Sequence, residues 1–190
     1  MDEFINIDRT FQKIIYLDKK ISNREFDGCV FKSCDFSNSV FSECTFIDCE
    51  FIDCNLAMIK LPATSFKTVV FKQCKLLGIQ FNECDDFLFN VAFRDCILDY
   101  SWFTNKKMPK TNFTSCSLKG VNFSAADLTS ADFENSNMEG AIFDKSILAA
   151  ADFSTAYNYK IDPEFNMIKK AKFTVNGIHG LLEKYDIKIE

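Results

Sequence analysis

The sequence of 190 residues predicts an all-β fold in which the chain winds as a coil with four short sides per turn. Three observations predict this fold. Large apolar residues recur at every fifth position, eight of the nine cysteines precede such a residue by two positions, and 22 residues are phenylalanine. A biased composition combined with a fixed period indicates one structural slot that is used many times.

The period of five excludes both an amphipathic helix and a continuous strand. From Phe11 to Phe81 every fifth residue is Phe, Tyr, Ile or Leu, whereas a helix requires spacings of three and four and a strand requires alternation. Residues two apart share one face of an extended segment. Each pentad therefore directs a large residue and the smaller one two positions before it inward, and the odd period requires a turn at each pentad.

The number of sides follows from residues that share a character one full coil apart. With twenty residues per coil, and a two-residue shift in the middle of the chain, one column contains only phenylalanine: Phe11, Phe31, Phe51, Phe71, Phe93, Phe113, Phe133, Phe153 and Phe173. A second column contains an uninterrupted run of five cysteines: Cys34, Cys54, Cys74, Cys96 and Cys116. A coil of fifteen residues would mix cysteine with other residue types, so we expect four sides. Cysteine then serves as a small apolar residue of the core.

The two-residue shift lies within NECDDFL (82–88), and we expect the repeat to resume at Leu88. Two placements of Asp86 remain open. It lies inward and forms a partly buried ion pair with Lys106 one coil later, or it tips outward and leaves Cys84 inward.

Three aromatic residues hold nominally outward positions near this break: Phe87, Phe89 and Trp102. A cluster of exposed aromatic side chains can mark a site for a protein partner. Alternatively, a local bulge folds these side chains back onto the coil. The sequence leaves both possibilities open.

The two ends differ from the repeat region, which we place at residues 11–156. Residues 1–10 are expected to form an N-terminal cap, because Arg9, Lys19 and Arg24 replace small residues where the coil meets solvent. Residues 157–190 lose the period and are expected to form a loop, a final strand of the coil and a short C-terminal α-helix.

The expected C-terminal helix places four apolar or aromatic residues on one face: Ile178, Leu181, Leu182 and Tyr185. A helix of this length is not stable alone. The face either plugs the open end of the coil or also pairs with a second chain, which would give a homodimer.

The charge distribution is uneven, with a net charge of −5. Residues 121–156 contain only one basic residue, Lys145, and six carboxylates: Asp127, Asp132, Glu134, Glu139, Asp144 and Asp152. The acidic balance argues against direct binding to nucleic acid or to an anionic membrane. An acidic start without a long apolar segment predicts a soluble, cytoplasmic protein.

No residue pattern indicates catalysis, a metal or a cofactor. Cysteines in a column point the same way and do not converge on one ion. The single histidine, His179, lies far from the cysteines, and no glycine-rich phosphate loop is present. We therefore expect a protein that is not an enzyme.

The segment ADLTSADFENSNMEGAIF (126–143) resembles the A(D/N)Lxx motif of pentapeptide-repeat proteins, and the similarity extends over residues 11–156. This resemblance implies a right-handed quadrilateral β-helix. Within the family, the size, the acidic balance and the C-terminal helix are similar to those of the Qnr and MfpA quinolone-resistance proteins. The rod-like dimers of these proteins resemble B-form DNA in shape and charge and bind DNA gyrase.

The resemblance therefore implies a DNA mimic that binds a type II topoisomerase, DNA gyrase, through the acidic residues of 121–156 and gives protection against quinolones. The alternative is an interaction scaffold with an unrelated protein partner, which would use the aromatic residues near the break or the terminal helix.

Overall fold

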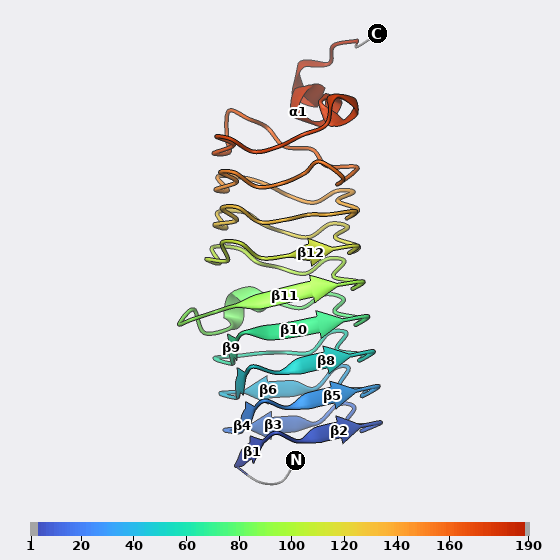
Figure 1. Cartoon of the computed structure of the whole chain (residues 1–190), viewed down its shortest axis with the longest axis vertical. Coiled ribbons are helices and arrows are strands. Elements are labelled where there is room, and N and C mark those ends of the chain that lie inside the picture. The colour runs from blue at the N-terminus through green and yellow to red at the C-terminus, as the bar shows by residue number, and fades with distance from the viewer. Residues whose placement is uncertain (1–3, 189–190) are drawn as a thin grey trace.

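The computed structural model describes residues 4–188. Figure 1 shows a rod of stacked coils, with the N-terminus at one end and a short helix at the other. Each coil has four sides, which we number in chain order from β1. The first side holds β1 (Ile5–Ile7), β4 (Glu25–Asp27), β7 (Thr45–Ile47) and β9 (Ser65–Lys67). The second side holds β2 (Thr10–Gln12), β5 (Val30–Lys32), β8 (Glu50–Ile52), β10 (Val69–Lys72), β11 (Val91–Arg94) and β12 (Phe113–Thr114).

The remaining two sides are less regular. The third side is joined between coils by isolated bridges, such as that between Asp35 and Asn55. The fourth side holds β3 (Lys20–Ser22) and β6 (Val40–Ser42). Every strand pair is parallel and joins residues one coil apart, as Phe31 joins Phe51 and Phe46 joins Phe66. The prediction of twenty residues per coil and four sides is therefore confirmed.

Stacked phenylalanine rings fill the interior of the rod. On the second side the rings of Phe31 and Phe51 lie 4.6 Å apart with an interplanar angle of 9°, and those of Phe113 and Phe133 lie 5.1 Å apart at 4°. Rings on adjacent sides meet edge to face, as Phe31 meets Phe46 at 6.0 Å and 69°. Both arrangements are favourable for aromatic pairs, so each ring is fixed by contacts along and across the rod.

All nine cysteines are buried and free, as the column pattern predicts. The Sγ atom of Cys54 lies 3.4 Å from the carbonyl oxygen of Phe31 in the preceding coil. The backbone N–H of Cys34 donates in turn to the Sγ atom of Cys54 at 3.4 Å. The thiols therefore act as small core groups that also satisfy backbone polar atoms of the wall.

The coil turns at left-handed residues that recur once per pentad. Examples are Asn38 at φ 57°, Asp53 at φ 53° and Gly120 at φ 61°. A left-handed conformation costs most residues about 1–2 kcal/mol, and glycine, asparagine and aspartate adopt it most readily. At Gly120 a Cβ atom would lie 2.7 Å from the ring of Tyr100 in the preceding coil, so a larger residue at this corner would have to displace that exposed ring.

The break contains a short 3₁₀ helix, η1 (Phe81–Glu83), followed by a protruding loop. The expectation that the inward pattern resumes at Leu88 is wrong. Leu88 is 63% exposed and occupies a left-handed turn at φ 58°, whereas Phe89 is buried. The ring of Phe89 lies 6.5 Å from that of Phe66, at the level where the first side lacks a strand. The core thus takes its missing side chain one residue later, and regular pairing resumes with β11.

The N-terminal end differs from the expected separate cap of residues 1–10. Residues 1–3 lie outside the described part of the chain, and β1 already forms the first side of a coil. Asn6 pairs with Phe26, and its side chain is fully buried at a position that holds phenylalanine in the next three coils.

The C-terminal end continues the coil further than expected. Within the expected loop, Tyr157 pairs with Asn137 and Met167 pairs with Ile147. The ring of Phe173 stacks on Phe153 at 5.1 Å, which confirms the return to the Phe column. The chain then forms η2 (Val175–Gly177), α1 (His179–Leu182) and η3 (Glu183–Tyr185).

The ring column should dominate stability. We expect Phe51→Ala to lower the free energy of unfolding by about 3–5 kcal/mol, because a ring stacked between two others is replaced by a cavity. Phe87→Ala is the matched control, since Phe87 is 66% exposed, and it should change stability by less than about 0.5 kcal/mol. Denaturant unfolding followed by circular dichroism measures both values. Equal effects would contradict the assignment of the core.

Candidate functional site

The surface, and not an enclosed cavity, carries the candidate interaction residues. The six carboxylates of 121–156, which we call the acidic belt, come from all four sides of the rod. Asp127 lies on the first side, Glu139 on the third and Asp144 on the fourth, while the second side carries Asp132, Glu134 and Asp152. Because Asp132 pairs with Asp152 one coil later, the belt encircles the rod over two coils. It does not form a stripe along the rod.

Half of the belt residues also have a structural task. Asp127 accepts hydrogen bonds from the backbone N–H and the hydroxyl of Thr129 at 3.0 and 2.6 Å. Asp132 accepts the N–H of Glu134 at 3.0 Å, and Asp152 accepts that of Ser154 at 2.9 Å. These bonds fix the turns. The three aspartates that accept them are only partly exposed, whereas Glu134, Glu139 and Asp144 project into solvent.

Two belt carboxylates form ion pairs. Glu139 lies 3.3 Å from Lys119, and Asp152 lies 2.8 Å from Lys172. The hydrogen bond from Lys172 lowers the pKa of Asp152 to about 2, so this carboxylate stays ionised in mildly acidic solution. The belt therefore combines four carboxylates that have no ion pair among residues 4–188 with two that are partly neutralised.

The loop at the break separates the three predicted aromatic residues. Phe89 folds back into the core, as the bulge alternative predicts. Phe87 remains 66% exposed and Trp102 48% exposed. Trp102 belongs to the fourth side, where it bridges Gln80, whereas Phe87 lies on the loop together with exposed Leu88. The sequence does not predict a pair of apolar side chains on a protruding loop, because the repeat places Leu88 in the core.

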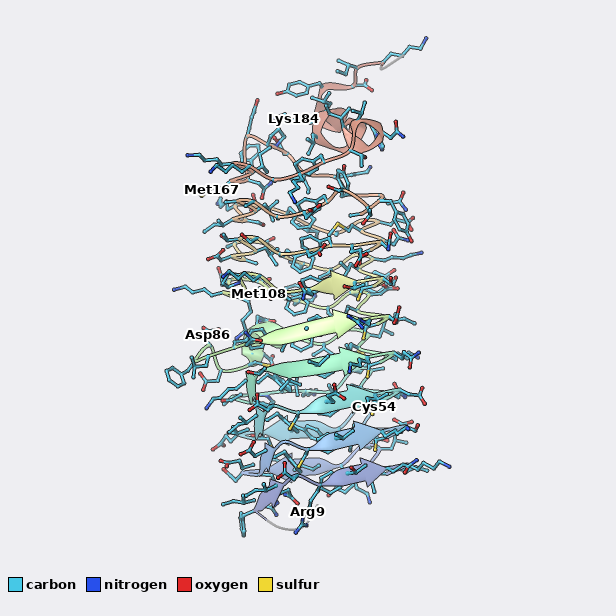
Figure 2. All side chains as sticks on the ribbon, in the orientation of Figure 1. Arg9, Cys54, Asp86, Met108, Met167 and Lys184 are labelled. Atoms are coloured by element: carbon cyan, nitrogen blue, oxygen red, sulfur yellow. The ribbon has the colours of Figure 1, made fainter. Side chains whose placement is uncertain are left out.

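The loop is tied to the rod by a buried lysine. The side chain of Lys106 is 1% exposed, and its Nζ atom donates to the carbonyl of Cys84 at 2.5 Å and to Oδ1 of Asp86 at 2.6 Å. The same ammonium lies 4.8 Å from the centre of the Phe89 ring. Asp86 is 77% exposed on the loop (Figure 2). The two alternatives for Asp86 are thus both partly right: it tips outward, and it still pairs with Lys106.

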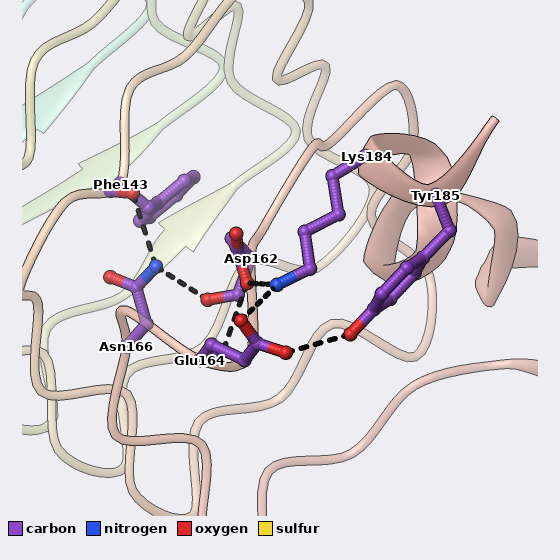
Figure 3. Close-up of polar contacts among 6 residues, drawn as sticks. All are labelled: Phe143, Asp162, Glu164, Asn166, Lys184 and Tyr185. Carbon is purple, nitrogen blue, oxygen red and sulfur yellow. Dashed lines mark hydrogen bonds and ion pairs between the residues drawn. The ribbon is translucent and has the colours of Figure 1, made fainter.

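The terminal helix is fastened to the end of the rod. Lys184 lies 2.8 Å from Asp162 and 2.7 Å from Glu164, and the hydroxyl of Tyr185 donates to Glu164 at 2.8 Å (Figure 3). Asn166 closes the turn beneath them by donating to the carbonyls of Phe143 and Asp162. The hydrogen bonds from Lys184 lower the pKa of both carboxyls that it contacts.

The predicted face of the helix is divided by this attachment. Leu181 packs against the core, and the carbonyl of Gly180 accepts the N–H of Ile161 at 2.9 Å. Leu182 is partly buried, while Ile178 is 44% and Tyr185 49% exposed. The contacts of Leu181 agree with the alternative in which the helix plugs the open end of the coil. Pairing with a second chain through the exposed residues Ile178 and Tyr185 stays a proposal.

Reactive side chains are dispersed or buried. Burial raises the pKa of the Cys49 thiol to about 12 and also raises that of Cys84, so that both stay protonated near neutral pH. His179 is exposed, with Nδ1 2.9 Å from the carbonyl oxygen of Asn176. Within residues 4–188 no three His, Cys, Asp or Glu residues are grouped so that they could hold a metal ion. No helix in this range is long and apolar enough to cross a bilayer.

A parallel β-helix with four sides, a five-residue period and corners at left-handed residues defines a β-solenoid built from pentapeptide repeats. Residues 24–101 match the family described as a pentapeptide repeat region, and residues 110–144 and 122–156 match the description of pentapeptide repeats in eight copies. These matches together extend over more than half of the chain. The chain belongs to the pentapeptide-repeat family.

Solved structures support the same fold over the whole length. A trypsin-treated variant of QnrB1, described as a plasmid-mediated fluoroquinolone resistance protein, is 15% identical with a TM-score of 0.71, and the match covers 98% of this chain and 99% of that one. Full-length QnrB1 is 16% identical with a TM-score of 0.61, covering 94% and 100%. The match over the full rod agrees with the expected right-handed quadrilateral β-helix. A search of curated protein sequences gave no match.

The contact between Lys106 and Asp86 should be asymmetric in its energetics. We expect Asp86→Ala to destabilise the protein by about 1–3 kcal/mol, because the buried ammonium loses its charged partner. Lys106→Met should cost less than about 1 kcal/mol, since the stem still fills the core and Asp86 is left in water. A double-mutant cycle by urea unfolding measures the difference. An Asp86→Ala effect no larger than that of Lys106→Met would show that the lysine does not depend on this carboxylate.

The ion pair of Asp152 with Lys172 should make the free energy of unfolding depend on pH. The pKa of Asp152 is lower in the folded chain than the ordinary value near 3.9, so its contribution is present above about pH 4 and is lost as the pH falls towards 2. Asp152→Asn should reduce the free energy of unfolding by about 0.2–1 kcal/mol at pH 7 and by nothing near pH 2. Asp144→Asn serves as control. A loss that is constant across this range would contradict the assignment.

Proposed function

We propose that the protein is a non-enzymatic binding rod that occupies the DNA-binding surface of a type II topoisomerase, DNA gyrase, and thereby protects the enzyme against quinolones. The supporting observation is the similarity to QnrB1 over almost the full length of both chains, including both ends of the rod. A shared repeat alone would give similar coils without a similar number of them.

The acidic belt is the surface that we propose for this contact. A topoisomerase presents cationic groups to DNA, and a carboxylate-rich rod can meet the same groups. Because the belt surrounds the rod, each side presents at least one carboxylate to a partner, and the second side presents three. Fields of this kind extend about one Debye length, roughly 8 Å at physiological salt, so belt residues on neighbouring sides act together.

A second candidate function is that of a scaffold for an unrelated protein. The observation that favours it is the protruding loop, where Phe87 is 66% and Leu88 63% exposed. Exposed apolar side chains at the tip of a loop are typical anchors for a partner protein. In this case the belt is an ordinary solvated surface and the loop, or the exposed part of the terminal helix, makes the contact.

A gyrase assay with charge variants tests the first proposal. The full chain should restore supercoiling in the presence of a fluoroquinolone at micromolar concentration. The belt variant combines Asp127→Asn, Asp132→Asn, Glu134→Gln, Glu139→Gln, Asp144→Asn and Asp152→Asn. It should be at least about tenfold less effective, because the charges are removed while the amide oxygens still accept the turn hydrogen bonds.

The matched control removes six carboxylates from corners outside the belt: Asp8→Asn, Asp18→Asn, Glu43→Gln, Asp48→Asn, Asp53→Asn and Asp95→Asn. All six are exposed, so this variant has the same net charge as the belt variant and should act like the unchanged protein. Absence of any effect of the unchanged protein on gyrase overturns the proposal and favours the scaffold. Equal loss in both variants would exclude a specific role for the belt.

A further inference from the structure

The second side of the rod carries charges in an order that reverses about the rung of Phe113, one rung beyond the central rung, that of Phe93. The rung of Phe113 is uncharged, because Asn112 and Thr114 flank the ring. Counting rungs along the paired strands, Arg94 lies one rung towards the N-terminus, Lys72 two and Glu50 three.

Towards the C-terminal end, Asp132 and Glu134 lie one rung away from that of Phe113, Asp152 two and Lys172 three. Rungs at equal distance from that of Phe113 therefore carry opposite charges in the three cases where both rungs exist, while Lys32, four rungs away, has no counterpart. The first two rungs on the N-terminal side are basic and their counterparts are acidic. At the third rung the signs are exchanged on both sides, so that Glu50 is the counterpart of Lys172.

We propose that two copies of this chain associate side by side and antiparallel through this second side. The two-fold axis runs along the strand of Phe113, in the plane of contact and perpendicular to the two rods. Rotation about this axis reverses the order of the rungs, so that each charged rung meets a rung of opposite charge. The strands of the two copies still run in the same direction. Arg94 then faces Glu134 of the second copy, and Glu50 faces Lys172 of the second copy. A contact of this kind is isologous, so each pair occurs twice.

The shape of the side agrees with its charge. A depression of about 210 Å³ lies over the basic half, and Val70 and Ala92 contribute its small side chains. In the antiparallel arrangement these two positions face Asp152 and Asp132 of the second copy, which stand on the same edge of the strands. The acidic half of one copy therefore meets the recessed, basic half of the other.

Ion pairs within each copy would be extended by the contact. Lys72 lies 2.6 Å from Glu50, and Lys172 lies 2.8 Å from Asp152. Both pairs lie two and three rungs from the axis, on opposite sides of it. The pair of Lys72 and Glu50 in one copy therefore meets the pair of Asp152 and Lys172 of the second copy. Together they form a network of four alternating charges. Lys110, at the corner on the level of the axis, approaches Lys110 of the second copy, and Asp95, next to Arg94, approaches Glu134 of the second copy. Both residues are exposed, so that their side chains can turn into water.

The size of the surface determines the strength of the association. Six intervals of about 4.8 Å and a width of three residues give roughly 300 Å² per copy, which is well below the ~800 Å² of a standard interface. Apolar burial is therefore small, and charge complementarity supplies most of the attraction. The dimer should be weak and should dissociate when salt is raised from about 0.05 M to about 0.5 M.

Sedimentation equilibrium of charge-reversed variants tests the arrangement. Arg94→Glu and Glu134→Arg should each raise the dissociation constant of the dimer at least about tenfold, because each variant then opposes like charges. An equimolar mixture of the two should associate again, since every pair is restored between the unlike copies. Lys60→Glu, a reversal of an exposed lysine on the fourth side, is the matched control and should leave association unchanged.

A cysteine at the axis provides a second, geometric readout. Thr114→Cys should form an intermolecular disulfide under mild oxidation, because the two copies of this position face each other, whereas Thr174→Cys near the end of the rod should not. The nine native cysteines are buried and serve as the internal blank. A chain that stays monomeric at low salt and millimolar concentration overturns the proposal. A dimer that is indifferent to both reversals, or that links through position 174 instead, overturns it as well.

Discussion

The structure depends on one constraint, namely that every large inward side chain must lie directly over the corresponding side chain of the neighbouring coil. Phenylalanine meets this requirement at the spacing of paired strands, since rings such as Phe31 and Phe51 stack at 4.6 Å while their backbones pair in register. Ring contact and backbone pairing therefore reinforce each other. A side chain that is too small would open a cavity, and one that is too large would force the coils apart.

The interior could be predicted from the sequence because its constraint acts at a fixed interval. The Phe column identifies the number of sides, and the cysteine column identifies the small inward position that precedes each large residue by two. Prediction was wrong where the interval is interrupted. Leu88 and Phe89 are both large and apolar, and only the path of the loop determines which of them points inward. The continuation of the coil through Tyr157 and Met167 was also missed, because exposed apolar residues replace the usual polar ones there.

The outer surface follows no such constraint, and this explains why function is harder to derive than fold. The belt carboxylates were recognised as a run in the sequence, but their distribution over four sides depends on the corner geometry. Asp127, Asp132 and Asp152 partly serve the turns, so an acidic composition overstates the charge that a partner would meet. The reversal of charge on the second side is invisible in the linear sequence, because it involves residues twenty and more positions apart.

The break at residues 82–88 shows how the architecture accommodates changes in chain length. Two additional residues are absorbed in one loop, and parallel pairing on the second side continues from Phe71 to Phe93 as if they were absent. The length of such a rod can thus change by whole coils, because the gain or loss of a complete coil leaves the contacts between neighbouring coils intact. An insertion of any other length has to be accommodated in a loop that protrudes from the rod. Lineages of this architecture can consequently vary in height by duplication while acquiring new protrusions at single corners, and these two modes of change remain independent.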